Sequence, residues 1–337
     1  MELKTDSFAV ETNVHFPTDL NLLWDSMRKC LDMVQVLQTI APIEGWREIK
    51  GWRKKLKSNF RSTSQVVFKG KDDKKKKAAV KGYLDMALEL KEKCNITIKN
   101  PPLLIGKEYE VNSIIELLKG YCNYADTFCD QIERRLIKGE TIPAEEKVFS
   151  IFEPHTEWLT KGKLNKKVEL GVLLMITTTQ YDFIVDYKVL EKQRDQAQVK
   201  ESIERIKKNY PGVVIRSSSY DKGFYTKENF QFVSKEATTA VMPKKGKLNK
   251  EEKQREGKEE FKLLRNKHSA VESNINMLEH HGLNRCMDKG IDSFKRYVGL
   301  SILAYNLHIL GNYLKEEEKK RQYILEMQRL RYHRKAA

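Results

Sequence analysis

The sequence predicts a mixed α/β protein of the α+β kind, in which one early strand and a run of helices precede the strands of one mainly antiparallel sheet. Two observations support this prediction. Residues 20–137 show the 3.6-residue spacing of apolar side chains that amphipathic helices have, whereas residues 147–190 contain β-branched and aromatic runs separated by turns. The chain of 337 residues is long enough for one large domain or two smaller ones.

The first strand is expected over residues 3–15, where Thr, Val and Phe alternate loosely with polar side chains before Pro17. Asp19 is the expected N-cap of the first helix, whose apolar face starts at Leu22. Three more helices are expected over residues 46–65, 78–94 and 109–136, with an exposed basic loop at 69–77.

After Pro143 the pattern changes to strands. We expect strands at residues 147–152, 168–177, 183–190, 212–217 and 239–242, and helices at 195–209 and 228–236. A basic segment, 244–267, leads into the helix that carries Glu272, and a basic helix is expected at 319–335. Residues 297–314 are the most apolar helix-length stretch, but their polar side chains favour a buried helix over a membrane span.

Composition indicates the class of partner. The formal net charge of +16 and the pI near 9.4 favour a polyanion, most simply nucleic acid, because lysines and arginines at phosphates release condensed counterions. The five cysteines form no Cys-x-x-Cys pair, which favours reduced thiols in a cytoplasmic protein. No phosphate-binding Gly-x-x-x-x-Gly-Lys-Ser/Thr motif is present, so action driven by ATP is not expected.

Three acidic residues are candidates for metal-dependent phosphodiester chemistry. Asp221 closes a predicted strand, Glu272 lies on a predicted helix whose apolar stripe includes Val271 and Ile275, and Asp6 lies in the first strand. A carboxylate on a helix facing an aspartate at a strand end is a common way to hold divalent cations. Taken singly, Asp-Lys-Gly at 221–223 is also an ordinary turn, and Glu272 an ordinary helix residue.

Several segments, in order along nearly the whole chain, resemble the catalytic core of bacterial insertion-sequence DDE transposases, and most closely the ISNCY-like group. The first acid is followed by Ser-Phe-Ala-Val-Glu-Thr-Asn-Val-His, and the second stands in Tyr-Asp-Lys-Gly-Phe. The third stands in His-Ser-Ala-Val-Glu-Ser-Asn-Ile-Asn. The matching segments are residues 6–25, 150–163, 168–171, 220–224, 241–246, 268–276 and 282–286.

The resemblance implies an RNase H-like mixed sheet with Asp6, Asp221 and Glu272 as catalytic metal ligands for two Mg²⁺ or Mn²⁺ ions. It implies double-stranded DNA as partner, both transposon ends and target, a homodimer on DNA, and no membrane. The implied division of the chain is the first strand at 1–19, a helical insertion at 20–142, the rest of the catalytic core at 143–314, and a basic C-terminal helix at 315–337.

Basic side chains near the acids are candidate DNA contacts. Lys222 adjoins the second acid, and Arg265 lies two turns before the third; each is equally well explained as a solvated charge. Lys244 and Lys245 are further candidates.

Other roles stay open. Glu153 is the substitute if the first acid fails, and His155, as a lone histidine, is more often structural. His268 and Glu272, four residues apart, could form half of a metal site, although a surface hydrogen bond is the usual role of such a pair. Trp46 and Trp52 could stack on a base, although helix packing is the more common role.

Two functions remain open at this stage. The first is a metal-dependent transposase core that cleaves and transfers DNA strands. The second is a truncated, non-catalytic DNA-binding protein, because related transposases carry a DNA-binding region before the first catalytic strand and Asp6 stands almost at the start of this sequence. A glycosidase with paired carboxylates is disfavoured by the positive charge.

Overall fold

The structure, a computed structural model, describes residues 1–102, 105–160 and 168–336; residues 161–163 of the motif at 150–163 lie outside the described residues. The chain folds into two compact units. The first, here called the sheet unit, comprises Met1–Val14 together with His155–Ala337, and the second, the helical unit, comprises His15–Pro154. The helical unit is thus inserted after the first strand of the sheet unit.

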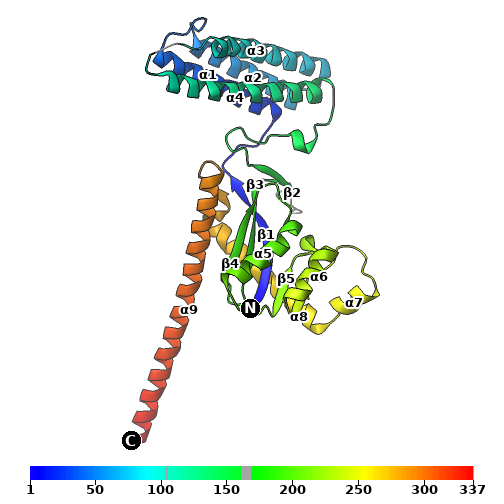
Figure 1. Cartoon of the computed structure of the whole chain (residues 1–337), viewed down its shortest axis with the longest axis vertical. Coiled ribbons are helices and arrows are strands. Elements are labelled where there is room, and N and C mark those ends of the chain that lie inside the picture. Colours follow the sequence, from blue (N-terminus) through cyan, green and yellow to red (C-terminus); the bar gives the residue numbers. More distant parts are fainter. Residues whose placement is uncertain (103–104, 161–167, 337) are drawn as a thin grey trace. The chain divides into compact units, whose positions relative to one another are not determined.

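The sheet unit is built on one mixed sheet (Figure 1). Within the described residues its strands are β1 (Glu2–Thr12), β2 (Glu157–Thr160), β3 (Val168–Thr178), β4 (Ile184–Leu190), β5 (Ser217–Tyr220), β6 (Thr239–Val241) and β7 (Arg285–Cys286). Their order is β2-β3-β1-β5-β6, with β4 also paired to β3 and β7 to β1. Strand β3 runs antiparallel to β1 and β4, whereas β5 is parallel to β1 and to β6. This mixed order around a central first strand is the expected RNase H-like fold.

Helices cover both faces of this sheet (Figure 1). On one face α5 (Asp195–Asn209) and α6 (Lys227–Glu236) bury Val199, Ile203 and Val233. The other face packs against α8 (Glu259–Leu278) and α9 (Ile291–Ala336), and α7 (Lys250–Glu256) precedes α8. The bounds predicted for the helix at 195–209 are confirmed.

Strand β1 contributes to both cores because its side chains alternate between the two faces. Leu3 packs in the core under α5, whereas Phe8 and Val10 pack against α8 and α9. The pairing of β1 with β3 runs without a register shift from Lys4 to Glu11. Asp6 therefore shares the α8 face of the strand with Phe8 and Val10.

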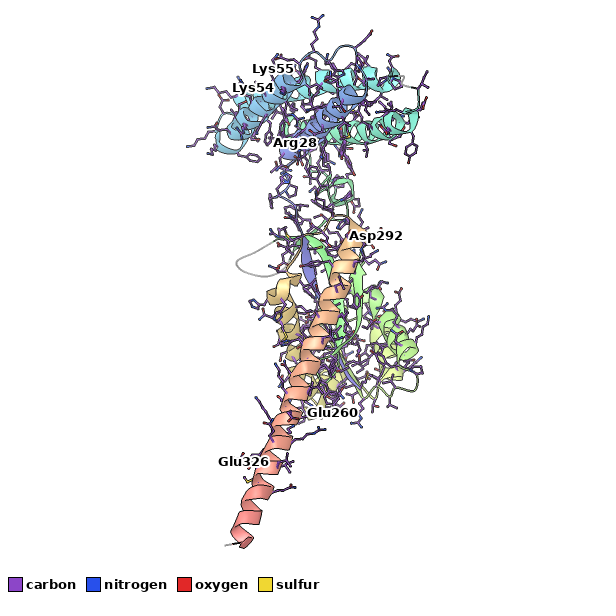
Figure 2. The ribbon with its side chains drawn as sticks, turned by 90° about the vertical axis from the view of Figure 1, so that its left-hand side faces the viewer. Arg28, Lys54, Lys55, Glu260, Asp292 and Glu326 are labelled. Carbon is purple, nitrogen blue, oxygen red and sulfur yellow. The ribbon has the colours of Figure 1, made fainter. Side chains whose placement is uncertain are left out.

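The helical unit contains four long helices: α1 (Asp19–Ile40), α2 (Ile49–Lys69), α3 (Asp73–Lys99) and α4 (Glu108–Ile132), the last continued by a π-helical turn, Glu133–Ile137. A short 3₁₀ turn follows at Ala144–Glu146. One apolar core joins these helices, with Leu31, Leu56, Leu90 and Leu118 fully buried. Lys54 and Lys55 lie on the exposed side of α2 (Figure 2).

Trp46 belongs to this core. Its ring is buried, and its Nε1–H donates to Thr97 Oγ1 over 2.8 Å. Trp52 packs partly buried against the same core. The two tryptophans therefore serve helix packing in this structure, as their more common role suggested.

Two helix starts differ from the sequence predictions. Thr18, not Asp19, is the N-cap of α1, because its hydroxyl accepts the N–H of Asn21 while the Asn21 side chain accepts the N–H of Thr18. The expected basic loop at 69–77 is mostly helix. Asp72 caps α3 by accepting the N–H groups of Lys74 and Lys75, so the lysine run continues as the first turns of α3.

Two of the predicted strands are wrong. Residues 147–152 form no strand, because the Ser150 hydroxyl accepts the N–H groups of Phe152 and Glu153 and turns the backbone, while Ile151 packs in the helical core. The strand expected at 212–217 starts only at Ser217 and continues to Tyr220. Strand β2, at Glu157–Thr160, was not predicted.

The apolar helix segment at 297–314 is buried on one side only. Val298, Ile302, Tyr305 and Ile309 pack on the sheet, but leucines on the opposite side are exposed. The expected basic helix at 319–335 is a continuation of α9. Among the described residues, no helix is both long and apolar enough to cross a membrane.

Candidate active site

The register between β1 and β5 places the first two candidate acids side by side. The parallel pairing runs from Glu2 opposite Ser217 to Thr5 opposite Tyr220. The next pair in this register is Asp6 and Asp221, and Asp221 keeps an extended backbone with φ −70° and ψ 162°. Paired strands lie about 4.8 Å apart. Continued by one residue, this register would set Asp6 beside Asp221, which lies 215 positions further along the chain.

Side-chain alternation puts both acids on the face that α8 covers. Tyr220 points to the opposite core, under α5 and α6. Ser219 points to α8, where its hydroxyl lies 3.0 Å from Nδ1 of His268. Asp221, two residues further on, continues on the same face as Ser219.

Helix α8, which carries the third acid, packs on the same face of the sheet. His268, bonded to Ser219, lies one turn before Glu272, and the buried side chains of Val271 and Ile275 hold that turn against the sheet. Further along, the Asn274 amide donates to Asp182 Oδ1 over 3.2 Å. The predicted apolar stripe of this helix is therefore confirmed, and Glu272 stays exposed beside it.

His268 is a neutral anchor between α8 and β5. Burial lowers the pKa of its imidazole to about 4, with Asp221 raising that pKa and Lys4 lowering it by smaller amounts. Its Nε2 has no hydrogen-bond partner among the described residues. The ring is thus held by Ser219, and its Nε2 forms no hydrogen bond with Glu272.

Each aspartate is oriented by its own backbone. The N–H of Ser7 donates to Asp6 Oδ1 over 2.7 Å, and the N–H of Lys222 donates to Asp221 Oδ1 over 2.6 Å. The carboxylate oxygens of the three acids do not all lie within 4.8 Å of one another. Among the described residues, the only group of three or more His, Cys, Asp or Glu side chains that close together is made of cysteines. The assignment of these three acids to one metal site therefore remains a prediction.

The basic side chains predicted to contact DNA differ in their exposure and in whether an acidic side chain balances their charge. Lys222, Arg265 and Lys245 are exposed. Lys244 is half-buried and lies 2.8 Å from Glu252, so its charge is balanced within the protein.

Lys4 lies two residues before Asp6 on the same face of β1, opposite Ser219. It is buried and donates to the carbonyl of Thr179. Sequence reasoning missed Lys4 and Ser219. The alternation of β1 could have indicated Lys4, but nothing local marks Ser219.

Glu153 and His155, whose roles the sequence left open, both pack against other parts of the protein. Glu153 is buried at the end of the helical unit, and its N–H donates to Ser150. His155 packs edge-on against Phe294 in the sheet unit, with ring centroids 5.6 Å apart. Glu153 thus belongs to a different unit from Asp221.

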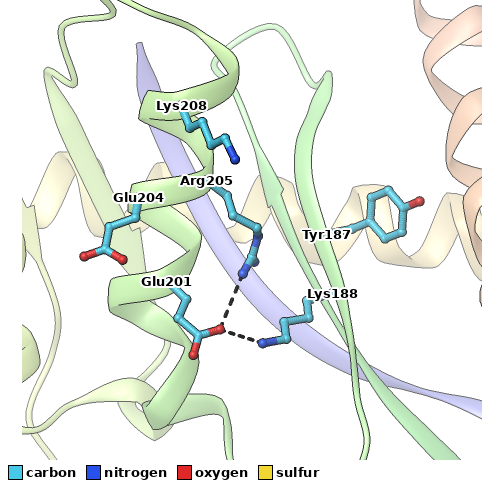
Figure 3. Close-up of a pocket in the computed structure, with 6 residues that line it drawn as sticks. All are labelled: Tyr187, Lys188, Glu201, Glu204, Arg205 and Lys208. Atoms are coloured by element: carbon cyan, nitrogen blue, oxygen red, sulfur yellow. Dashed lines mark hydrogen bonds and ion pairs between the residues drawn. The ribbon is translucent and has the colours of Figure 1, made fainter.

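A shallow depression of about 500 Å³ lies elsewhere, between β4 and α5 (Figure 3). Lys188 and Arg205 both reach Glu201 there, at 2.6 Å and 3.8 Å. These charges neutralise one another, and the depression contains none of the three candidate acids.

Comparison with known proteins identifies the family. A family model described as a transposase DDE domain matches residues 133–307. The chain belongs to the DDE transposase family. The matched segment of this transposase includes Asp221 and Glu272 but starts after β1, so the position of Asp6 rests on the sheet register. Neither the curated proteins nor the solved structures gave a match.

Proposed function

We propose that this transposase is a catalytic core that cleaves DNA strands and joins them to a target, with Asp6, Asp221 and Glu272 as its catalytic metal ligands. The observation that carries the proposal is the β1–β5 register, whose last pair, Thr5 and Tyr220, directly precedes Asp6 and Asp221. Membership of the DDE transposase family supports it.

The donor set fits Mg²⁺ or Mn²⁺, because all three side chains offer hard carboxylate oxygens and the nearby imidazole of His268 is engaged by Ser219. Held by these three acids, such ions would supply activation of a water or 3′-hydroxyl and charge stabilisation of the leaving 3′-oxygen. Asp6 sits on the central strand, which gives the site a rigid base.

The chain's own cations favour phosphates at this site. Lys4 is held on the same strand face as Asp6, and Lys222 follows Asp221 directly. We assign Lys222, Arg265 and Lys245 to contacts with the DNA backbone, whereas Lys244 supports the loop through Glu252. Positive charge of this kind offsets the repulsion between three acids and a polyanion.

The helical unit supplies a second DNA contact in this proposal. Helix α2 carries seven basic side chains and no acidic one: Lys50, Arg53, Lys54, Lys55, Lys57, Arg61 and Lys69. Only Arg53 of these forms an ion pair among the described residues, with Asp32 over 2.7 Å. A helix with so many exposed, unbalanced cations fits a phosphate backbone.

A strand-nicking assay tests the catalytic assignment. The purified chain is incubated with Mg²⁺ or Mn²⁺ and a supercoiled plasmid that contains the DNA flanking its own gene. We expect nicking that needs the metal and is lost in Asp221→Asn, while Asp288→Asn, an exposed aspartate of the same unit, keeps it. Nicking that is equal in both variants would reject the assignment.

The same assay decides the second candidate function. A chain that binds the plasmid but never nicks it, with either metal, would be a non-catalytic DNA-binding protein. Binding is measured on the same preparations by gel shift, so that loss of nicking is separated from loss of binding. A cytoplasmic setting agrees with either outcome, since all five cysteines are free thiols.

We also propose that the protein acts as a homodimer through α9. Five exposed leucines follow one another at alternating spacings of three and four residues, the heptad spacing of coiled coils: Leu300, Leu303, Leu307, Leu310 and Leu314. They lie opposite the face that packs on the sheet. An exposed apolar stripe of this length is typical of an association surface.

A second copy of the chain is the occupant that this stripe favours, because leucines in heptad spacing can pack against the same leucines of another copy across a two-fold axis. The stripe lies on one continuous helix.

The mass of the protein in solution tests the dimer. We expect a dimer by sedimentation or light scattering, and a monomer for the double variant Leu303→Glu with Leu307→Glu. The control is Leu263→Glu, which changes a similarly exposed leucine on α8. A wild-type monomer, or a double variant that stays dimeric, would exclude this interface.

A further inference from the structure

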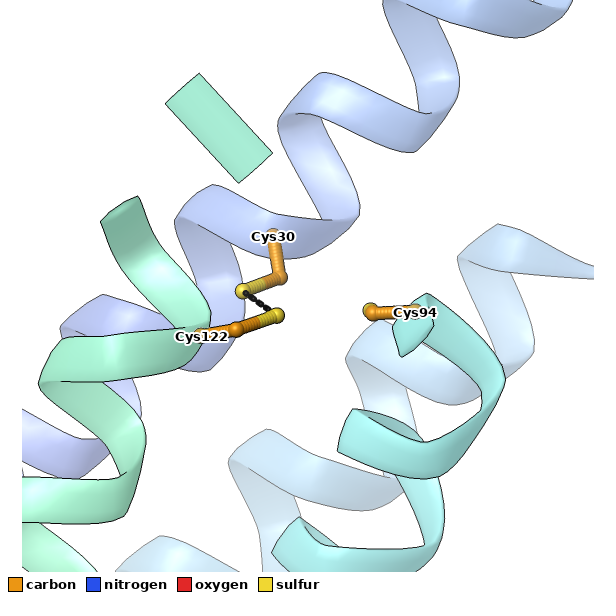
Figure 4. Close-up of side chains that lie close together, drawn as sticks. All are labelled: Cys30, Cys94 and Cys122. Atoms are coloured by element: carbon orange, nitrogen blue, oxygen red, sulfur yellow. Dashed lines mark hydrogen bonds between the residues drawn. The ribbon is translucent and has the colours of Figure 1, made fainter. Parts of the chain in front are cut away.

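Three cysteines from three helices meet inside the helical unit (Figure 4). Cys30 lies on α1, Cys94 on α3 and Cys122 on α4. All three sulfurs lie within 4.8 Å of one another, and Cys30 Sγ and Cys122 Sγ are 3.8 Å apart. Residues separated by 64 and 28 positions in sequence thus place their thiols at one point of the core. We call this group the thiol cluster.

The spacing fits an ion coordinated by three sulfurs. Metal–sulfur bonds of about 2.3 Å place the sulfurs of a flat three-coordinate site roughly 4 Å apart. The 3.8 Å between Cys30 and Cys122 agrees with this value. It is far longer than the sulfur–sulfur bond of a disulfide, about 2.05 Å. The thiols are close enough to share one ion without being bonded to one another.

The residues around the thiol cluster leave sulfur as the donor atom for a bound ion. Cys30 and Cys94 are fully buried and Cys122 is 4% exposed. Among the described residues, no other His, Cys, Asp or Glu joins this group of possible ligands. Hard cations prefer oxygen, so the chemistry selects a soft, thiophilic ion.

Binding of an ion by the three thiols would release their protons to solvent without any transfer of electrons.

The simpler explanation is that cysteine fills a core as a small apolar residue. Such packing does not require sulfurs to face one another. Cys129 on the same helix as Cys122 shows this alternative: it packs partly buried against the core and is not part of the cluster. The convergence of three of the five cysteines is what core filling alone leaves unexplained.

We propose that Cys30, Cys94 and Cys122 form a buried three-sulfur site for one thiophilic metal ion, which ties α1, α3 and α4 together. The shared chemistry admits Cu⁺, for which three sulfurs suffice, and Zn²⁺ or Cd²⁺, which usually recruit a fourth ligand such as water. The site is separate from the acids of the sheet unit and does not depend on the proposed transposition activity.

Metal content of the purified full-length protein tests the site. The wild-type chain is produced in cells grown with added zinc, copper or cadmium, purified with a non-thiol reductant, and analysed by mass spectrometry for metal per chain. We expect about one ion per chain in at least one of the three arms. The arm that is filled identifies the ion.

Matched variants assign the ion to the cluster. Cys94→Ser and Cys94→Ala should reduce bound metal at least tenfold, whereas Cys129→Ser should keep it. Circular dichroism checks that each variant is folded, and thermal unfolding with and without metal gives a second readout, since an ion bound only by the folded chain raises the melting temperature.

The proposal is overturned if wild-type protein carries no more metal than the triple serine variant of the cluster in all three arms. It is also overturned if Cys129→Ser loses the ion to the same extent as Cys94→Ser. Retention of the full metal content by folded Cys94→Ser or Cys94→Ala would also overturn the proposal.

Discussion

The sheet unit and the helical unit place their reactive side chains in opposite ways. In the sheet unit the acids stand at the end of β5, at the middle of β1 and on α8, where Asp221 and Glu272 are exposed. In the helical unit the thiol cluster is buried and the basic side chains of α2 are outside. One chain thus combines exposed acidic side chains on a sheet and a helix with a closed group of thiols inside a helical core.

This contrast follows from the two kinds of packing. A central strand with neighbours on both sides fixes its own side chains through register, and the strand end opens to solvent. A bundle of helices buries one stripe from each helix, so side chains from distant positions meet only in its core. Hard carboxylates therefore belong to the first unit and soft thiols to the second.

The largest expected effect concerns the third acid. Glu272→Gln should reduce metal-dependent nicking about a thousandfold, because an amide cannot replace a carboxylate as a charged ligand. Glu259→Gln, an exposed change at the start of the same helix, should leave the rate within twofold. Equal rates for both variants would show that the open end of the sheet unit is not the catalytic site.

The next effect compares the two cores. Leu31→Ala in the helical unit and Leu174→Ala in the sheet unit each remove a fully buried side chain and should each cost about 3 kcal/mol. If the units unfold separately, calorimetry should show two transitions, with each variant lowering a different one. A single transition lowered equally by both variants would mean that the two units unfold as one.

A smaller effect tests the basic face of α2. The triple variant Lys54→Ala, Lys55→Ala and Lys57→Ala should weaken DNA binding about tenfold. The slope of log affinity against log salt should fall by about 0.9 for each lysine that contacts a phosphate.

The control for this test is a second triple variant outside α2, Lys107→Ala with Lys119→Ala and Lys138→Ala. Two of these lysines are already balanced, Lys119 by Glu116 and Lys138 by Glu133. If both triple variants lower the salt slope equally, α2 has no special role in DNA binding.

The smallest effect concerns the contact that positions α8. Ser219→Ala removes the hydrogen bond to His268 and should lower the stability of the sheet unit by about 1 kcal/mol. Nicking should decrease only a few-fold, with unchanged DNA affinity, because no metal ligand is lost. Ser269→Ala, which removes a hydroxyl on the exposed side of the same helix, serves as reference.

Part of this architecture could be predicted from local pattern. The helix at Asp195–Asn209 and the apolar stripe of α8 follow from 3.6-residue periodicity, which needs only neighbouring residues. Predictions from periodicity were wrong where hydrogen bonds to a polar side chain decided the backbone conformation. Ser150 turned an expected strand, and Asp72 converted an expected loop into the start of α3.

The sequence indicated the acids of the candidate site, but not how these acids and their neighbours are arranged in space. Asp6, Asp221 and Glu272 were indicated by the sequence, and their assignment as metal ligands remains a prediction. The anchors of the site, Ser219 and Lys4, were not indicated, because a buried serine and a buried lysine acquire their roles only from the partner that packs on them.

The sequence by itself determined most of the succession of strands and helices and the family, and it indicated the three candidate acids, because these depend on local periodicity and short motifs. Only the tertiary structure decided that β1 pairs with β5 directly before Asp6 and Asp221, that three cysteines meet in one core, and that five leucines of α9 face outward. The physical reason is that strand register and helix packing join residues distant in sequence, and these contacts depend on all elements together.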